Sequence, residues 1–131
     1  MKKLMTMCVA IMIASFCTLQ AQDLRKGGSV FGKVESNGDV RIGGSVKGRF
    51  ESNGDIRVGG SVKGRIESNG DIRKGGSVVG RVESNGDVRI SGSVKGRIES
   101  NGDVRQSGSV VGSAKGVKAT YAAVIFFFDF F

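Results

Sequence analysis

The chain has 131 residues, a formal net charge of +8, 22 glycines and no histidine, tryptophan or proline. Both cysteines, Cys8 and Cys17, precede residue 22, so the remainder has no thiol for a disulfide or for nucleophilic catalysis. Acidic and basic residues alternate along the chain, which is typical of a solvated mixed-sign surface and not of a nucleic-acid-binding patch. We therefore expect no enzymatic activity, no cofactor and no nucleic-acid partner.

Residues 1–21 have the layout of a secretory signal peptide. Lys2 and Lys3 are followed by an apolar run from residue 4 to 16, and Ala21 provides a small residue at a cleavage position before Gln22. A membrane anchor is the alternative, although the run is shorter than the ~20 residues of a spanning helix. We expect export to the periplasm, the cell surface or the medium, with residues 22–26 as a short lead-in.

A 16-residue unit then repeats five times between residues 27 and 106. The third copy, at 59–74, reads GGSVKGRIESNGDIRK. A fixed short period indicates units that bury their apolar residues only against neighbouring units. The sequence therefore predicts one repeat domain at 27–112, followed by a linker and hydrophobic tail at 113–131.

The repeat has the side-chain alternation of β-strands. In the second copy, even-numbered positions are small or aliphatic, as at Val46, Phe50, Ile56 and Val58, and odd-numbered positions are mainly polar. The high glycine content argues against helices in the repeats. The predicted fold class is all-β.

Two β arrangements fit this pattern. Asn-Gly in every repeat is a strong hairpin signal, and a three-residue Ser36-Asn37-Gly38 loop keeps the apolar face intact. That antiparallel meander would place Glu35 opposite Asp39, and Lys33 opposite Arg41, at a cost of a few tenths to ~1 kcal/mol for each like-charged pair. A β-solenoid (β-helix) of about five 16-residue coils avoids this conflict, and we favour it.

In such a solenoid, Val46, Phe50, Ile56 and Val58 would stack on their equivalents in the next coil, ~4.8 Å away. The arginines at the same repeat position would form a column that could bind an anionic ligand: Arg49, Arg65, Arg81 and Arg97. Asn and Asp at each corner could ligate calcium. Ordinary turn chemistry explains them better, and we expect no metal site.

The phrases Ile42-Gly43-Gly44-Ser45-Val46-Lys47-Gly48-Arg49-Phe50 and their equivalents at 58–66, 74–82 and 90–98 resemble the core of the bactofilins. The resemblance covers about residues 27–112. It implies a β-helix that polymerises end to end without nucleotide. Bactofilins are cytoplasmic, whereas this chain begins with a predicted export signal, and their repeats are less regular.

The C-terminal tail is strongly apolar, and five of the eight phenylalanines fall in its last six residues. We expect it to cap an open end of the solenoid, to drive self-association or to contact a membrane surface. The residues that would do so are Tyr121, Ile125, Phe126, Phe127, Phe128, Phe130 and Phe131.

Two functional hypotheses follow from the sequence. The first is a non-enzymatic, exported structural protein that polymerises end to end or acts at the cell surface, since open sheet edges invite pairing with other chains. The alternative is a monomeric binding module for an anionic glycan or another envelope polymer. The first predicts that removal of residues 119–131 changes the oligomeric state, and the second predicts salt-sensitive ligand binding.

Overall fold

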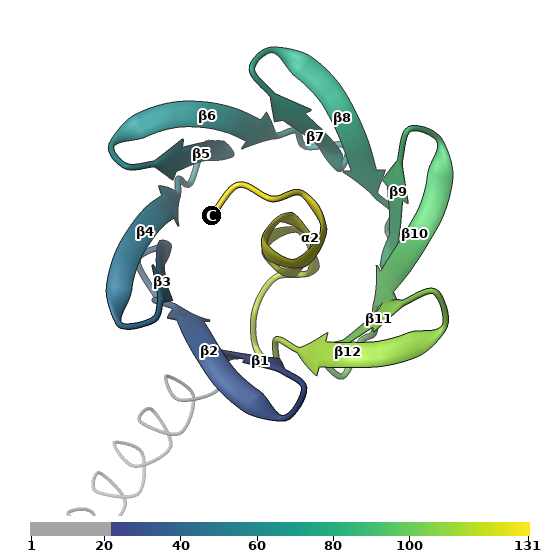
Figure 1. The fold of residues 1–131 in the computed structure, drawn as a ribbon. Helices are drawn as coiled ribbons and strands as arrows, with labels where there is room; N and C mark the ends of the chain where they lie inside the picture. Colours follow the sequence, from purple (N-terminus) through teal and green to yellow (C-terminus); the bar gives the residue numbers. More distant parts are fainter. Residues whose placement is uncertain (1–21) are drawn as a thin grey trace, which may run out of the picture.

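The computed structural model describes residues 22–131 and contains twelve strands and a C-terminal helix (Figure 1). The predicted signal peptide, residues 1–21, lies outside the described residues. The elements are β1 (Asp23–Lys26), β2 (Ser29–Val34), β3 (Asp39–Ile42), β4 (Ser45–Phe50), β5 (Asp55–Val58), β6 (Ser61–Ile66), β7 (Asp71–Lys74), β8 (Ser77–Val82), β9 (Asp87–Ile90), β10 (Ser93–Ile98), β11 (Asp103–Gln106), β12 (Ser109–Ser113) and α2 (Ala119–Phe127).

The strands form one closed antiparallel barrel rather than a solenoid. Each strand pairs with its neighbours in sequence, and β1 closes the ring against β12 through Arg25 opposite Ser113 and Lys26 opposite Gly112. The all-β prediction is confirmed, whereas the prediction of five stacked parallel coils is wrong. Each 16-residue unit supplies two antiparallel strands, so the repeats run around a ring instead of along a rod (Figure 1).

The like-charged pairs that counted against the antiparallel meander do occur. Arg41, Glu35 and Asp39 each also form an ion pair with an opposite charge. Lys33 does lie opposite Arg41, and the Glu35 N–H donates to the Asp39 carbonyl at 2.8 Å. However, Arg41 Nε lies 2.6 Å from Glu35 Oε2, diagonally across the pair. On the other side of β3, Asp39 lies opposite Arg49, and its Oδ1 forms an ion pair with Arg49 Nε at 3.2 Å. Ion pairs therefore form on both sides of β3, with Glu35 just after β2 and with β4. The second of these is absent from an isolated hairpin of β2 and β3.

Two turn types join the strands. Gly43 and Gly44 have φ of 63° and 86°, as a two-residue type I′ hairpin requires. Ser91 occupies the first of these positions in the fifth repeat with φ of 53°, which non-glycine residues adopt only occasionally. At the Ser-Asn-Gly loops, the Asp39 N–H donates to Asn37 Oδ1 at 3.0 Å, the ordinary turn role predicted for these side chains.

A β-bulge in every longer strand changes which side chains face the core. In β4 the register shifts between Val46, opposite Arg41, and Gly48, opposite Val40, so Lys47 is the extra residue. Val46 is consequently 47% exposed, and its equivalents Val30, Val62, Val78, Val94 and Val110 are 48–49% exposed. The prediction that Val46 belongs to the core is wrong. Phe50 and Ile56 are confirmed as core residues, and Val58 is half-buried.

Residues 22–26 are part of the barrel rather than a lead-in. The segment Asp23–Lys26 forms β1, which makes a hairpin with β2 and closes the ring against β12. Its sequence, DLRK, has the same pattern as the DIRV of β5. Six hairpins, one more than the number of complete repeats, therefore make up the wall.

The core lies inside the ring and is filled by the C-terminal tail (Figure 1). One fully buried aliphatic residue projects inward from each short strand: Leu24, Val40, Ile56, Ile72, Val88 and Val104. Helix α2 contributes the buried Ala122, Ala123 and Val124. The tail therefore folds within the barrel, and its helix was not predicted from the sequence.

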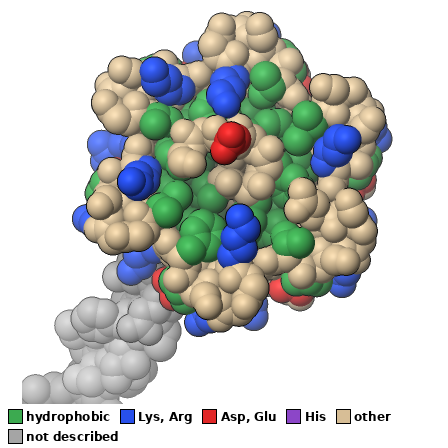
Figure 2. Space-filling view, viewed as in Figure 1, with side chains coloured by type: hydrophobic (Ala, Val, Ile, Leu, Met, Phe, Trp, Pro, Cys, Tyr) green, Lys and Arg blue, Asp and Glu red, His purple; other side chains and the backbone are tan. Residues whose placement is uncertain are grey.

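The tail phenylalanines pack against glycines of the wall. A Cβ added at each of five wall glycines would lie 2.5–2.9 Å from a phenylalanine ring, so only glycine leaves room for the ring. The pairs are Gly112 with Phe126, Gly96 with Phe127, Gly80 with Phe128, Gly64 with Phe130, and Gly48 with Phe131. Five of the six wall glycines at this repeat position therefore have one ring each. Figure 2, which has the same view as Figure 1, shows hydrophobic side chains inside the ring of hairpins.

Candidate anion-binding clefts

The arginines predicted to form a column lie instead side by side around the outer wall of the barrel, in a row that we call the arginine belt. Arg49, Arg65, Arg81 and Arg97 lie on β4, β6, β8 and β10. Each lies opposite a second arginine on the following strand, as Arg65 does opposite Arg73 and Arg81 opposite Arg89. The structure thus brings together pairs of guanidinium groups, of which only one member, at Arg49 and its equivalents, was predicted to bind an anion.

Every arginine of this belt has a carboxylate partner. Arg49 lies 3.2 Å from Asp39, and its three equivalents lie 3.7 Å from the corresponding aspartates. The arginines on the following strands are closer to their glutamates, for example Arg89 Nε at 2.7 Å from Glu83 Oε2. The belt is therefore balanced in charge, and its surface ion pairs contribute little stability each.

Lysines differ from these arginines in having no acidic partner. Among residues 22–131, the nine ion pairs all use arginine, and none uses lysine. Lys63 and Lys95 occupy the bulge positions of β6 and β10 and are exposed. Lys63 and Lys95 are thus positive charges without an ion-pair partner among residues 22–131, and they lie close to the turns Gly59-Gly60 and Ser91-Gly92.

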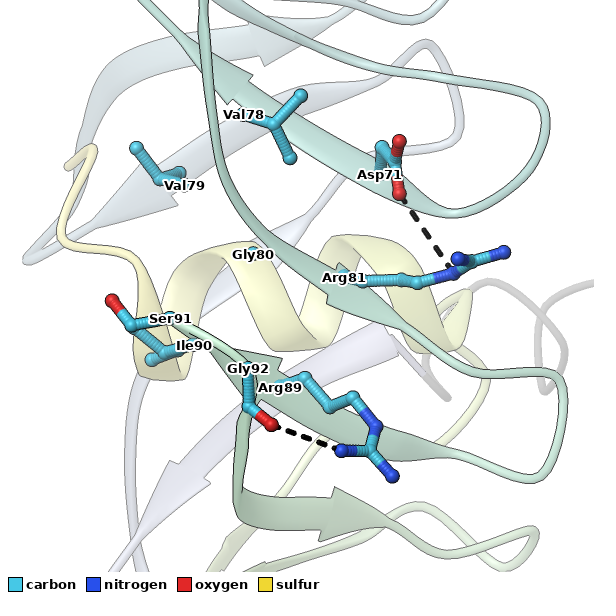
Figure 3. A pocket seen from close by; sticks show the side chains of 9 residues that line it. All are labelled: Asp71, Val78, Val79, Gly80, Arg81, Arg89, Ile90, Ser91 and Gly92. Atoms are coloured by element: carbon cyan, nitrogen blue, oxygen red, sulfur yellow. Dashed lines mark hydrogen bonds and ion pairs between the residues drawn. The ribbon is translucent and has the colours of Figure 1, made fainter.

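A cleft of about 570 Å³ opens where β8 and β9 separate near these turns (Figure 3). The two strands pair from Gly80 opposite Ile90 to Val82 opposite Val88. On the turn side of the Gly80–Ile90 pair they no longer pair, and the two hairpins diverge. Val78 and Val79 of β8 line it with Ile90 of β9, and Gly80 separates it from the core. Asp71, Arg81 and Arg89 supply its charged groups (Figure 3).

The same cleft recurs between the neighbouring hairpins. The one between β6 and β7 has a volume of about 360 Å³ and includes Val62, Lys63, Arg65 and Arg73. The one between β10 and β11 has a volume of about 290 Å³ and includes Val94, Lys95, Arg97 and Arg105. Each cleft thus combines an exposed valine with two arginines, and the two outer clefts each add a lysine.

The second arginine of each cleft is held in place by the surrounding hairpin. In the central cleft, Arg89 Nε donates to Glu83 Oε2 at 2.7 Å and its Nη1 donates to the Gly92 carbonyl at 3.1 Å. Arg73 and Arg105 make the same two contacts in the outer clefts. These two contacts use two of the five N–H bonds of each guanidinium. A positioned guanidinium with an unused N–H group is well suited to an anionic oxygen.

The tail residues predicted for capping or self-association lie mainly inside the barrel. Phe128 and Phe130 are buried, and Ile125, Phe126, Phe127 and Phe131 are half-buried against the core. Tyr121 stacks on Phe50, with ring centroids 4.1 Å apart. The tail packs inside the barrel and does not cap a solenoid end, and the self-association and membrane contact predicted for it stay predictions.

The bulge lysines and the exposed valines were missed by the sequence analysis. Strict alternation places Val62 and Val78 in the core and gives Lys63 no special position. The signal that was available is the unequal length of the two strands in each unit, six residues in β6 against four in β7. Antiparallel strands of unequal length between fixed turns require an extra, bulged residue.

Across residues 22–131 no three acidic, histidine or cysteine side chains come together as metal ligands. Nor does the described chain contain a helix long and apolar enough to cross a membrane. No protein-family model, curated protein or solved structure matches this chain. The bactofilin resemblance therefore stays a sequence-based prediction, and the β-helix that it implied is not the fold of residues 22–131.

Proposed function

We propose that this protein is a non-enzymatic, exported binding module that takes an anionic glycan or envelope polymer at the clefts of its outer wall. The observation that carries the proposal is the repetition of one cleft, with its exposed valine and positioned arginine, between three neighbouring pairs of hairpins. Catalysis is disfavoured because the same charged groups recur in every unit and no cleft has a distinctive nucleophile or base.

End-to-end polymerisation has less support from the closed barrel than from the predicted solenoid. That hypothesis needed unpaired strand edges at the ends of a solenoid. In residues 22–131, β1 and β12 pair with each other, so every strand has a neighbour on both sides. The binding-module alternative needs no open edge and is consistent with a closed ring.

Replacement of the cleft lysines is expected to weaken binding of an acidic glycan. Because Lys63 and Lys95 have no carboxylate partner among the described residues, Lys63→Gln together with Lys95→Gln removes attraction without breaking an ion pair. We expect about fivefold weaker binding of fluorescein-labelled polygalacturonate, measured by anisotropy. Binding of the unmodified protein should also fall at high salt.

A double variant, Lys115→Gln with Lys118→Gln, is the matched control. These lysines follow β12 at the Asn-Gly-turn end, away from the three clefts, and their replacement makes the same change in net charge. Equal weakening by both double variants would show that only the overall charge matters. Absence of polygalacturonate binding by the unmodified protein at low salt would refute the proposed function.

A further inference from the structure

The three clefts follow one another along the wall. One hairpin lies between each neighbouring pair, and its short strand contributes its arginine to one cleft and its aspartate to the next. Strand β7 gives Arg73 to the first cleft and Asp71 to the central one, and β9 gives Arg89 to the central cleft and Asp87 to the third. A ligand that passes from one cleft to the next therefore crosses one hairpin, which contributes side chains to both clefts.

The clefts also recur at a regular interval. Two strands lie between equivalent points of neighbouring clefts, which gives a separation of about 10 Å across the strands. This is close to the length of a disaccharide in an extended chain. Equivalent sites at a regular spacing fit a ligand with a regular chemical repeat better than they fit a single small molecule.

The lining of the clefts favours sugars over bases. No aromatic residue lines any of the three clefts, and their large apolar side chains are Val62, Val78, Val79, Ile90 and Val94. Single-stranded nucleic acids need aromatic platforms on which bases stack. Aliphatic side chains instead pack on the C–H face of a sugar ring, while the guanidinium groups bind its carboxylate.

We propose that the three clefts bind one linear acidic glycan, which runs around the barrel with successive units of its chain seated in successive clefts. This inference rests on the proposed function and makes it more specific. The ligand class is a linear acidic glycan, and its chain follows the circumference of the barrel. Its binding site covers the three clefts between neighbouring hairpins.

The test is a titration of the full-length protein with oligogalacturonates of increasing length. Occupation of further clefts by one chain raises the effective concentration of each unit, so an oligomer that spans all three clefts should bind about 10²-fold more tightly than one that fills a single cleft. Affinity should stop rising once the oligomer is longer than the three clefts.

Two matched variants locate the ligand. Val78→Glu places a carboxylate in the central cleft, whereas Val30→Glu makes the same change at the equivalent position of β2, outside the three clefts; both valines are 49% exposed. We expect Val78→Glu to remove most of the gain in affinity with length. Val30→Glu should keep that gain, and thermal unfolding checks that both variants fold.

The outcomes separate this inference from the proposed function. Lysine-dependent binding that does not change with oligomer length would overturn the inference and leave the proposed function standing. Equal losses from Val78→Glu and Val30→Glu would also overturn it. Tighter binding of single-stranded oligo(dT) than of an oligogalacturonate of the same charge would point to nucleic acid and contradict both.

Discussion

Removal of residues 119–131 is expected to abolish the folded barrel. The tail supplies the buried Val124, Phe128 and Phe130 and several half-buried aromatic side chains. At ~1.5–3 kcal/mol for each fully buried side chain, its contribution is of the order of 10 kcal/mol. That is comparable with the whole stability of a typical domain, about 5–15 kcal/mol. Circular dichroism should show loss of the cooperative thermal transition, and sedimentation should show aggregation through the exposed interior.

Asp129→Asn is the control for this deletion. Asp129 is exposed and has φ of 58°, a conformation that asparagine tolerates. The contact from Lys74 Nζ, at 3.3 Å, is to the backbone carbonyl of Asp129 and does not need its carboxylate. The control should unfold at nearly the same temperature as the unmodified protein. A truncated chain that kept its cooperative transition at that temperature would contradict the position of the tail inside the barrel.

Gly80→Val is expected to be the most damaging single substitution of those considered. A Cβ at Gly80 would lie 2.5 Å from the Phe128 ring and would also collide with the Arg89 carbonyl on the paired strand. Because this clash involves backbone, the cost should reach about 3 kcal/mol. A loss of that size lowers the melting temperature of a domain of this length by roughly 15 °C. Differential scanning calorimetry measures the change.

Gly75→Asn separates this steric effect from a general need for glycine. Gly75 is the first residue of a type I′ turn, has φ of 61° and has no atom within 4 Å of an added Cβ. Asparagine is favoured at this position of such turns, so the melting temperature should hardly change. A loss as large as that of Gly80→Val would show a general need for glycine and contradict the steric explanation of the Gly80→Val effect.

The strands could be predicted from the sequence, but their arrangement could not. Alternation identified both strands of every unit and placed Phe50 and Ile56 in the core. The choice between coil and meander depended on Lys33 opposite Arg41 in an isolated hairpin. The decisive partners, Glu35 on the diagonal and Asp39 with the next strand, appear only when neighbouring hairpins are combined.

Closure of the ring could not be predicted from the sequence of single repeats either. The four residues Asp23–Lys26, near the start of the described residues, complete the sixth hairpin and pair with β12, which follows the last repeat. The sequence of β1 resembles that of the other short strands and does not indicate that β12 is its partner. That pairing depends on how many hairpins fit around the tail. Of the arginines predicted as an anion-binding column, Arg65, Arg81 and Arg97 line the clefts and Arg49 lines none of the three, and anion binding stays a prediction.

A designed disulfide tests the closed ring, on which the clefts and their proposed ligand depend. Arg25 and Ser113 are partners across β1 and β12, and such partners have Cα atoms about 4.5–5.5 Å apart, within reach of a disulfide. Arg25→Cys with Ser113→Cys, in a chain with Cys8 and Cys17 replaced by serine, should form an intramolecular bridge under mild oxidation. The pair Arg25→Cys with Ser77→Cys, on strands that do not pair, should not. Non-reducing electrophoresis and intact mass distinguish the products. A bridged monomer is the expected result, and bridges only between chains, or none, would contradict the closed barrel.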